Sequence, residues 1–150
     1  MKLKTKDFFY VVIQFVLFAV YILDINFLQF ILPEFLNMFS IIIAIIGGFI
    51  ILIAMLQLNK NLSPFPSPKS NSQLIKKGLY KYIRHPIYTG ILFLLFGYGI
   101  YMNSLFKIII AFVLLLLFYF KTSYEEQRLI QKFTDYSEYK KTAGSFFPKL

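Results

Sequence analysis

Cysteine is absent from the 150-residue chain, and histidine occurs once, as His85. Without cysteine the chain has no disulfide, no thiol nucleophile and no thiolate metal ligand. Charged side chains are also scarce, at 15% of the residues, against roughly 25% in soluble domains. Only two of the sixteen basic residues are arginines, Arg84 and Arg128. Arg84 and His85 are consecutive, so two of the rarest side chains of the protein lie next to each other.

Apolar residues are correspondingly abundant in the chain. They make up 58% of the chain, including 19 phenylalanines, and a soluble protein of this length could not bury so much apolar surface. Runs of about 20 apolar residues are typical of membrane-spanning helices. We therefore predict an all-α polytopic membrane protein, a single domain over residues 1–150 with about four transmembrane helices. The predicted spans are 8–32, 35–58, 87–102 and 105–120, with a loop over 59–86 and a tail over 121–150.

The last two predicted spans are separated by little more than Asn103 and Ser104, so we expect a tight antiparallel helical hairpin. Each of these spans covers about 24 Å at 1.5 Å per residue, which is short for a membrane crossing. The prolines of the sequence SPFPSP disfavour helix in the preceding loop. The tail carries apolar residues at helical spacing, so we predict a cytoplasmic amphipathic helix that continues the fourth span and lies along the membrane surface.

The basic residues indicate the topology. Fifteen of the sixteen fall at the chain ends or between spans two and three, and only Lys107 falls on the other side of the predicted bundle. Because cytoplasmic loops carry an excess of lysine and arginine, we expect both termini and the active site to be cytoplasmic, in a membrane of the bacterial inner-membrane type. The net charge of +9 favours contact with anionic head groups, so membrane lipids are expected partners and nucleic acid is not.

A charged cluster is predicted where spans three and four meet the cytoplasm. Arg84 and His85 precede span three, and Glu125 and Glu126 follow span four. Because the two arms of the hairpin are equal in length, these side chains are expected at the same level on adjacent helices. Ionisable groups in such a position are candidates for a functional site. Two plainer interpretations stay open: Arg84 can extend to lipid phosphates, and Glu125 with Arg128 can form a solvated helix pair.

Span three also carries three glycines, Gly90, Gly97 and Gly99. Glycine in a membrane helix lets a neighbouring backbone or a ligand approach closely. Gly90 and Gly97 are seven residues apart, so we expect them on one face of the helix.

Two other kinds of function are weighed. One histidine and two glutamates can in principle hold a divalent ion, but further good ligands are lacking nearby, and no metal is expected. A small transporter or a non-enzymatic membrane protein is the alternative of a different class. A transporter would need an acidic residue near the bilayer midplane, and the one candidate, Asp24, lies toward the outer end of its predicted span.

The segment from Leu74 onward resembles a family of membrane enzymes. It reads LIKKGLYKYIRHPIYTGILFLLFGYGIYMNS and, later, YEEQRLIQKFTDYSEYKKTAGSFFP. The order of R-H-P-x-Y-x-G, a G-x-G in the following span and paired glutamates after the next span is similar to the membrane methyltransferases related to isoprenylcysteine carboxyl methyltransferase and phospholipid N-methyltransferase. The resemblance implies S-adenosylmethionine as methyl donor, bound at the cytoplasmic end of the last helices, and a lipophilic methyl acceptor that enters from the bilayer.

The resemblance also implies roles for individual residues, and their chemistry suits the methyl donor. A cation suits its carboxylate, a glutamate suits its ammonium or its ribose hydroxyls, and tyrosine faces suit its sulfonium. The implied catalytic residues are Arg84, Glu125 and Glu126, and the implied cofactor-binding residues are Tyr82, His85, Tyr88, Gly97, Gly99, Glu125 and Glu126.

The methyl acceptor has two candidates. We favour the carboxylate of an isoprenylcysteine-like substrate, and the amine of a phosphatidylethanolamine-type lipid is the alternative. A carboxylate acceptor needs no base, whereas an amine must lose one proton, which Glu125, Glu126 or His85 can accept. Residue spacing does not choose between these two reactions.

Overall fold

The computed structural model describes residues 3–23, 25 and 29–149. Within these residues the chain is helical, with no strand beyond two isolated bridges, so the all-α prediction is confirmed. The helices are α1 (Thr5–Ile22), α2 (Glu34–Leu58), α3 (Pro86–Tyr101), α4 (Leu105–Lys132) and α5 (Tyr136–Thr142), with short 3-10 turns η1 (Asn59–Asn61) and η2 (Gly78–Lys81).

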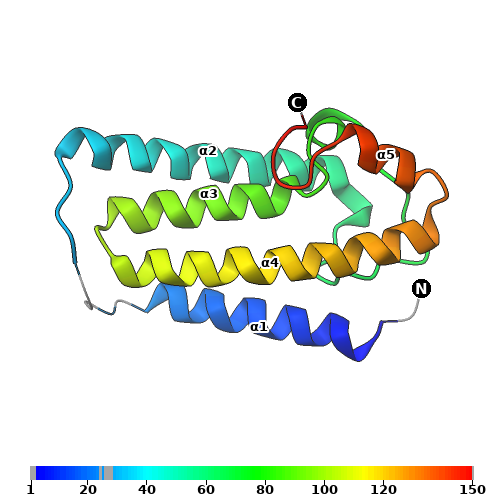
Figure 1. Ribbon diagram of the computed structural model, residues 1–150, viewed down its shortest axis with the longest axis horizontal. Coiled ribbons are helices and arrows are strands. Elements are labelled where there is room, and N and C mark those ends of the chain that lie inside the picture. The colour runs from blue at the N-terminus through cyan, green and yellow to red at the C-terminus, as the bar shows by residue number, and fades with distance from the viewer. Residues whose placement is uncertain (1–2, 24, 26–28, 150) are drawn as a thin grey trace.

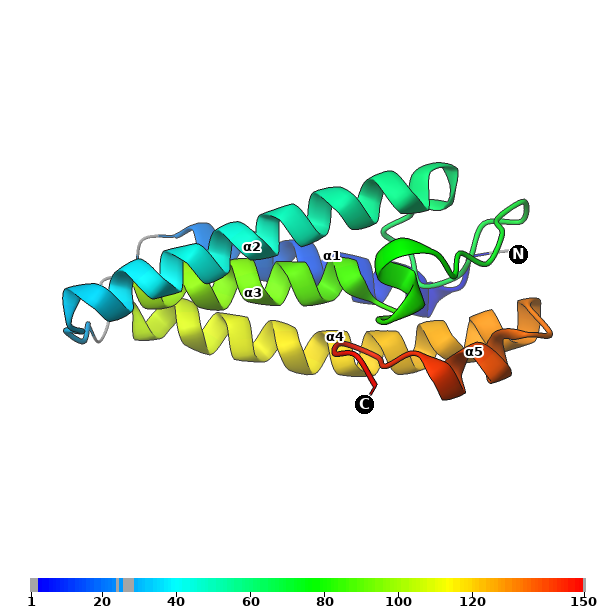
Figure 2. The ribbon, with the colours of Figure 1, turned by 90° about the horizontal axis from the view of Figure 1, so that it is seen from above.

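Four long helices lie side by side in the order α2, α3, α4, α1 (Figure 1). α2 packs on α3, α3 on α4, and α4 on α1. Among the described residues, α1, α2 with η1, and α4 are each long and apolar enough to cross a membrane, and α3 is a shorter apolar helix of 16 residues. Figure 2 shows α5 running back along the end of α4 that projects from the bundle. The polytopic membrane architecture follows from these apolar helices.

The hairpin between α3 and α4 is as tight as predicted. Asn103 adopts a φ of 50° in the turn, a left-handed conformation that asparagine tolerates better than most residues. Ser104 caps α4 because its hydroxyl accepts a hydrogen bond from the backbone N–H of Lys107 at 3.3 Å. Pro86 lies in the first turn of α3, where its missing N–H has no helical partner to lose. These features fix the start and end of each arm.

Glycines hold α2 and α3 together by close backbone contact. A Cβ added to Gly90 would lie 2.7 Å from the carbonyl oxygen of Gly47, and one added to Gly97 would lie 2.6 Å from that of Ser40. Gly90 and Gly97 therefore both face α2, which confirms that they share one side of the helix. Small residues at such contacts let membrane helices approach closely.

The first helix is shorter than predicted. α1 ends at Ile22, whereas the span was expected to continue to residue 32. A buried ammonium group marks this end, since Nζ of Lys107 donates a hydrogen bond of 2.9 Å to the carbonyl oxygen of Tyr21. This carbonyl, in the last turn of α1, is thereby paired with a cation instead of with the backbone N–H of a further helical turn. Asp24, the one acidic residue considered for the transporter alternative, lies outside the described residues.

The tail is helical, as predicted, but it is not one continuous helix along the membrane surface. α4 ends at Lys132, and α5 turns back toward the bundle (Figure 2). The apolar residues of the tail pack against the protein, because α5 and the end of α4 cover part of the preceding loop. The resulting cluster contains Tyr136, Tyr139 and Ala143, with Leu74, Leu129 and Phe133 around them.

We predict that Gly97→Ala lowers the stability of the bundle. The added Cβ would lie 2.6 Å from backbone atoms of α2, and overpacking of this kind costs about 1–3 kcal/mol. Gly48→Ala is the matched control, because nothing lies within 4 Å of a Cβ at Gly48 in α2. Thermal unfolding in detergent compares the two variants. Equal midpoints would contradict the close α2–α3 contact.

Candidate active site

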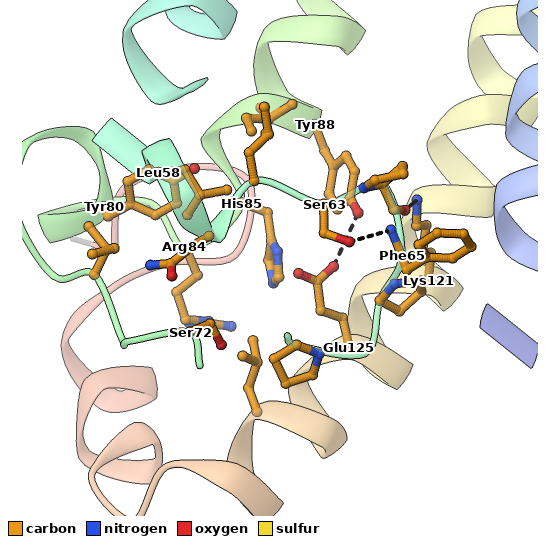
Figure 3. A pocket seen from close by; sticks show the side chains of 18 of the residues that line it. Leu58, Ser63, Phe65, Ser72, Tyr80, Arg84, His85, Tyr88, Lys121 and Glu125 are labelled. Atoms are coloured by element: carbon orange, nitrogen blue, oxygen red, sulfur yellow. Dashed lines mark hydrogen bonds between the residues drawn. The ribbon is translucent and has the colours of Figure 1, made fainter. Parts of the chain in front are cut away.

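A cavity of about 490 Å³ lies at the end of the bundle where α5 packs (Figure 3). Small-molecule and cofactor sites usually fall between about 300 and 1,000 Å³. Its wall is formed by α1, α2, the 61–75 loop, η2, the start of α3, α4 and α5. Of the residues predicted for the site, four line this cavity: Arg84, His85, Tyr88 and Glu125.

Arg84 and Glu126 form a buried ion pair beside the cavity. Nη2 and Nε of Arg84 lie 2.7 Å and 2.8 Å from Oε1 of Glu126, and both side chains are 8% exposed. Lys140 of α5 reaches the other carboxylate oxygen, Oε2, with its Nζ at 2.7 Å. Arg84 also donates from Nη1 to the carbonyl oxygen of Ala143. The pair therefore joins the start of α3, α4 and the segment after α5.

His85 is the third partner of Glu126. Its Nε2 lies 3.3 Å from Oε1 of that carboxylate, and its backbone N–H donates to the carbonyl oxygen of Ser145 at 3.1 Å. The imidazole stacks on the ring of Tyr88, with centroids 5.8 Å apart, and Tyr88 stacks in turn on Phe118 at 4.6 Å. Ring stacking on Tyr88 and the backbone hydrogen bond to Ser145 in the tail thus hold His85 in place.

Glu125 has different surroundings from its neighbour. Oε2 of Glu125 accepts a hydrogen bond of 3.1 Å from the hydroxyl of Tyr88 (Figure 3). One helical turn earlier, the buried Lys121 donates from Nζ to Oε1 of Gln14 at 2.5 Å and to the carbonyl oxygen of Pro64 at 3.0 Å. The ammonium of Lys121 also lies 5.1 Å from the ring centroid of Tyr88. This second cluster joins α1, the loop, α3 and α4.

The two glutamates therefore have different structural positions. Glu125 lines the cavity, whereas Glu126 is engaged by Arg84, His85 and Lys140. Consecutive residues of an α-helix point about 100° apart, so one carboxylate faces the cavity and the other faces the tail. Glu125 is available to a ligand, and Glu126 acts as the residue that positions Arg84 and His85.

A buried network fastens the proline-containing loop over the cavity. The carboxylate of Asp7, which is fully buried, accepts hydrogen bonds of 2.9 Å from both the backbone N–H and the hydroxyl of Ser67. Nε of Arg128 donates to the same Ser67 hydroxyl at 3.2 Å. Arg128 is 6% exposed, so the interpretation of a solvated pair with Glu125 does not hold.

Four predicted cofactor-binding residues do not line the cavity: Glu126, which pairs with Arg84, and Tyr82, Gly97 and Gly99. The side chain of Tyr82 projects outward and is 56% exposed. Gly97 lies against α2, and a Cβ on Gly99 would lie 3.3 Å from the Cβ of Lys107 on α4. Gly97 is eleven residues beyond the first residue of α3, which places it about 16 Å along the helix. The structure therefore gives these glycines a packing role and does not place them among the cavity residues.

Sequence reasoning missed several residues of the wall. Lys121 is one of the basic residues that indicate the topology, and its spacing of four residues before Glu125 is the signal that places both on one face of α4. Gln14, Pro64 and Tyr136 also line the cavity. Gln14 and Pro64 come from segments far away in the sequence, and Tyr136 follows the helical apolar pattern of the tail, which does not indicate a cavity residue.

The family comparison points to the same part of the chain. The family model for phospholipid methyltransferases matches residues 35–136. The chain belongs to the phospholipid methyltransferase family. The segment that matches this family begins in α2 and ends at the first residue of α5, and it contains Arg84, His85, Glu125 and Glu126. No curated protein matches the chain significantly.

The cavity residues of this family member suit the methyl donor S-adenosylmethionine by their chemistry. The carboxylate of Glu125 suits an ammonium group, and the guanidinium of Arg84 suits a carboxylate. The ring of Tyr80 lines the same cavity and suits a sulfonium cation, whereas the ring of Tyr88 is already stacked on His85 and Phe118. For a metal ion the fit is poor, because no group of three or more histidine, aspartate or glutamate side chains in the described part of the chain is placed to hold one.

We predict that Glu126→Ala destabilises the protein strongly. The change leaves the buried Arg84 without its carboxylate, and breaking a buried ion pair costs about 3 kcal/mol or more. Glu138→Ala is the control, because the Glu138–Lys141 pair has side chains 75% and 71% exposed, and exposed pairs contribute about 1 kcal/mol or less. Thermal unfolding in detergent measures both, and a similar small change for the two variants would contradict the positioning role of Glu126.

Proposed function

We propose that this membrane methyltransferase transfers a methyl group from S-adenosylmethionine to a lipophilic acceptor at the cytoplasmic membrane surface. One observation carries the proposal: a cofactor-sized cavity with a charged wall from Arg84 and Glu125 lies at one end of a bundle of apolar helices. The excess of basic residues at this end of the bundle supports a cytoplasmic orientation.

The charged wall would hold the polar groups of the cofactor. S-adenosylmethionine, when bound, supplies an electrophilic methyl group on its sulfonium. Glu125 would hold the ammonium, and the ring of Tyr80, which lines the same cavity, would lie beside the sulfonium. The loop fastened by Asp7 and Ser67 helps to exclude water. Alignment in a dry site supplies much of the acceleration of such a displacement.

The remaining wall of the cavity suits an apolar acceptor. It is formed by side chains of α1, α2 and α3, three helices that also present apolar residues outward. A lipid chain can therefore extend from the cavity between these helices toward the hydrocarbon phase. The apolar wall residues are Phe15, Phe18, Ile51, Met55, Ile87 and Ile91.

Within this proposal, the amine of a phospholipid suits the cavity better than the carboxylate that the sequence resemblance first favoured. Glu125 would face a carboxylate acceptor with like charge, whereas it attracts a protonated amine. The amine must lose one proton before its lone pair can attack the methyl group in line, and His85, which lines the same cavity, would accept it while Glu125 holds the cofactor ammonium.

We predict that Glu125→Gln weakens the binding of S-adenosylmethionine by roughly 10-fold or more, because charge-assisted hydrogen bonds contribute about 1.5–3 kcal/mol. Isothermal titration calorimetry in detergent measures the affinity. Glu34→Gln is the control, since Glu34 opens α2 at the opposite end of the bundle. A folded wild-type sample that binds no S-adenosylmethionine would sink the proposed function, and an unchanged Glu125→Gln affinity would remove the ligand role of Glu125.

The chemistry of the product identifies the acceptor. Membranes that contain the protein are incubated with methyl-labelled S-adenosylmethionine, and the extracted lipids are treated with base. We predict that the label stays on nitrogen and resists release as methanol, because an N-methyl bond survives conditions that hydrolyse a methyl ester. Membranes with Glu125→Ala provide the background. Base-labile label would instead establish a carboxylate acceptor.

A further inference from the structure

Tyr136 has a hydroxyl group that the fold does not use. Its side chain is 1% exposed and forms part of the cavity wall. Within the described part of the chain, this hydroxyl has no hydrogen-bond partner. Buried polar groups in native proteins nearly always have a partner, so an orphaned hydroxyl beside a cavity indicates a partner that arrives with a ligand.

The other tyrosines of the cavity differ from Tyr136 in this respect. The hydroxyl of Tyr139 donates to the carbonyl oxygen of Tyr80, that of Tyr88 donates to Glu125, and that of Tyr80 donates to the carbonyl oxygen of Ala54 at 3.4 Å. These three hydroxyls stabilise the wall itself. Tyr136 belongs to the same wall and leaves its donor unused.

The electrostatic surroundings keep the Tyr136 hydroxyl protonated. Burial raises the pKa of Tyr136 well above its usual value, the negative charges of Glu126 and Glu125 raise it further, and Arg84 acts in the opposite direction. At neutral pH the group is therefore a neutral donor. Two of the charged residues that act on it, Glu125 and Arg84, line the same cavity.

We propose that the Tyr136 hydroxyl donates a hydrogen bond to the carboxylate of the amino-acid part of S-adenosylmethionine. The inference rests on the proposed function and assigns one group of the cofactor to one residue. A neutral donor near Arg84 suits an anionic oxygen, while Glu125 suits the neighbouring ammonium. Tyr136 is then a cofactor-binding residue contributed by α5.

The test compares two phenylalanine variants and two ligands. Tyr136→Phe removes the orphaned hydroxyl at the cavity. Tyr124→Phe is the matched control, because the hydroxyl of Tyr124 is also buried without a partner in the described structure, whereas its ring stacks on Tyr10 at 5.8 Å, outside the cavity. The ligands are S-adenosylmethionine and decarboxylated S-adenosylmethionine, titrated calorimetrically into purified protein, and unfolding midpoints are measured without ligand.

We expect Tyr136→Phe to weaken S-adenosylmethionine binding by roughly 10-fold, the usual size for a hydrogen bond to a charged group, and to leave the affinity for the decarboxylated ligand unchanged. The unfolding midpoint without ligand should stay equal or rise, because no protein hydrogen bond is lost. Tyr124→Phe should change neither affinity. Three results for Tyr136→Phe would overturn the assignment: an equal loss of affinity for both ligands, no loss for either, or a lower unfolding midpoint. The proposed function would still stand in each case if the wild-type protein binds S-adenosylmethionine.

Discussion

The carboxylate of Glu126 holds the functional end of the bundle together. One of its oxygens lies 2.7 Å from the Arg84 guanidinium and 3.3 Å from the His85 ring, and the other lies 2.7 Å from the Lys140 ammonium. These partners come from the start of α3 and from α5, so a single side chain of α4 fixes both. Arg84 extends the arrangement by donating to Ala143. The cavity wall depends on this placement, because Arg84, His85 and α5 all contribute to it.

Much of this end of the molecule could be predicted from the sequence, because helix geometry is regular. Two apolar runs of equal length joined by a two-residue turn return the chain to its starting level, which correctly brought Arg84 and His85 to the paired glutamates. The same reasoning could not assign the glutamates separate positions. Adjacent residues on a helix point about 100° apart, and what lies in each direction depends on α5 and on the cavity.

Other features depend on contacts between distant segments, which local patterns do not show. The Asp7–Ser67–Arg128 network joins three parts of the chain, and no spacing or motif in the sequence links these residues. Gly97 illustrates a different difficulty, because glycine permits close approach by either a ligand or a helix. Here the neighbour is the backbone of α2. Composition alone does not distinguish the two, whereas the direction in which the residue faces does.

Two kinds of contact stabilise the bundle, glycine packing between α2 and α3 and buried ionised groups around the cavity. Between α2 and α3, glycine contacts provide packing that needs no charge. Around the cavity, buried ionised groups are bound to one another, although burying ions is costly and apolar replacements are often as stable. A bundle that needed only stability would have little reason to keep Lys121 and Glu125 facing a common wall. A charged wall beside an apolar one suits the proposed reaction between a polar methyl donor and a lipophilic acceptor.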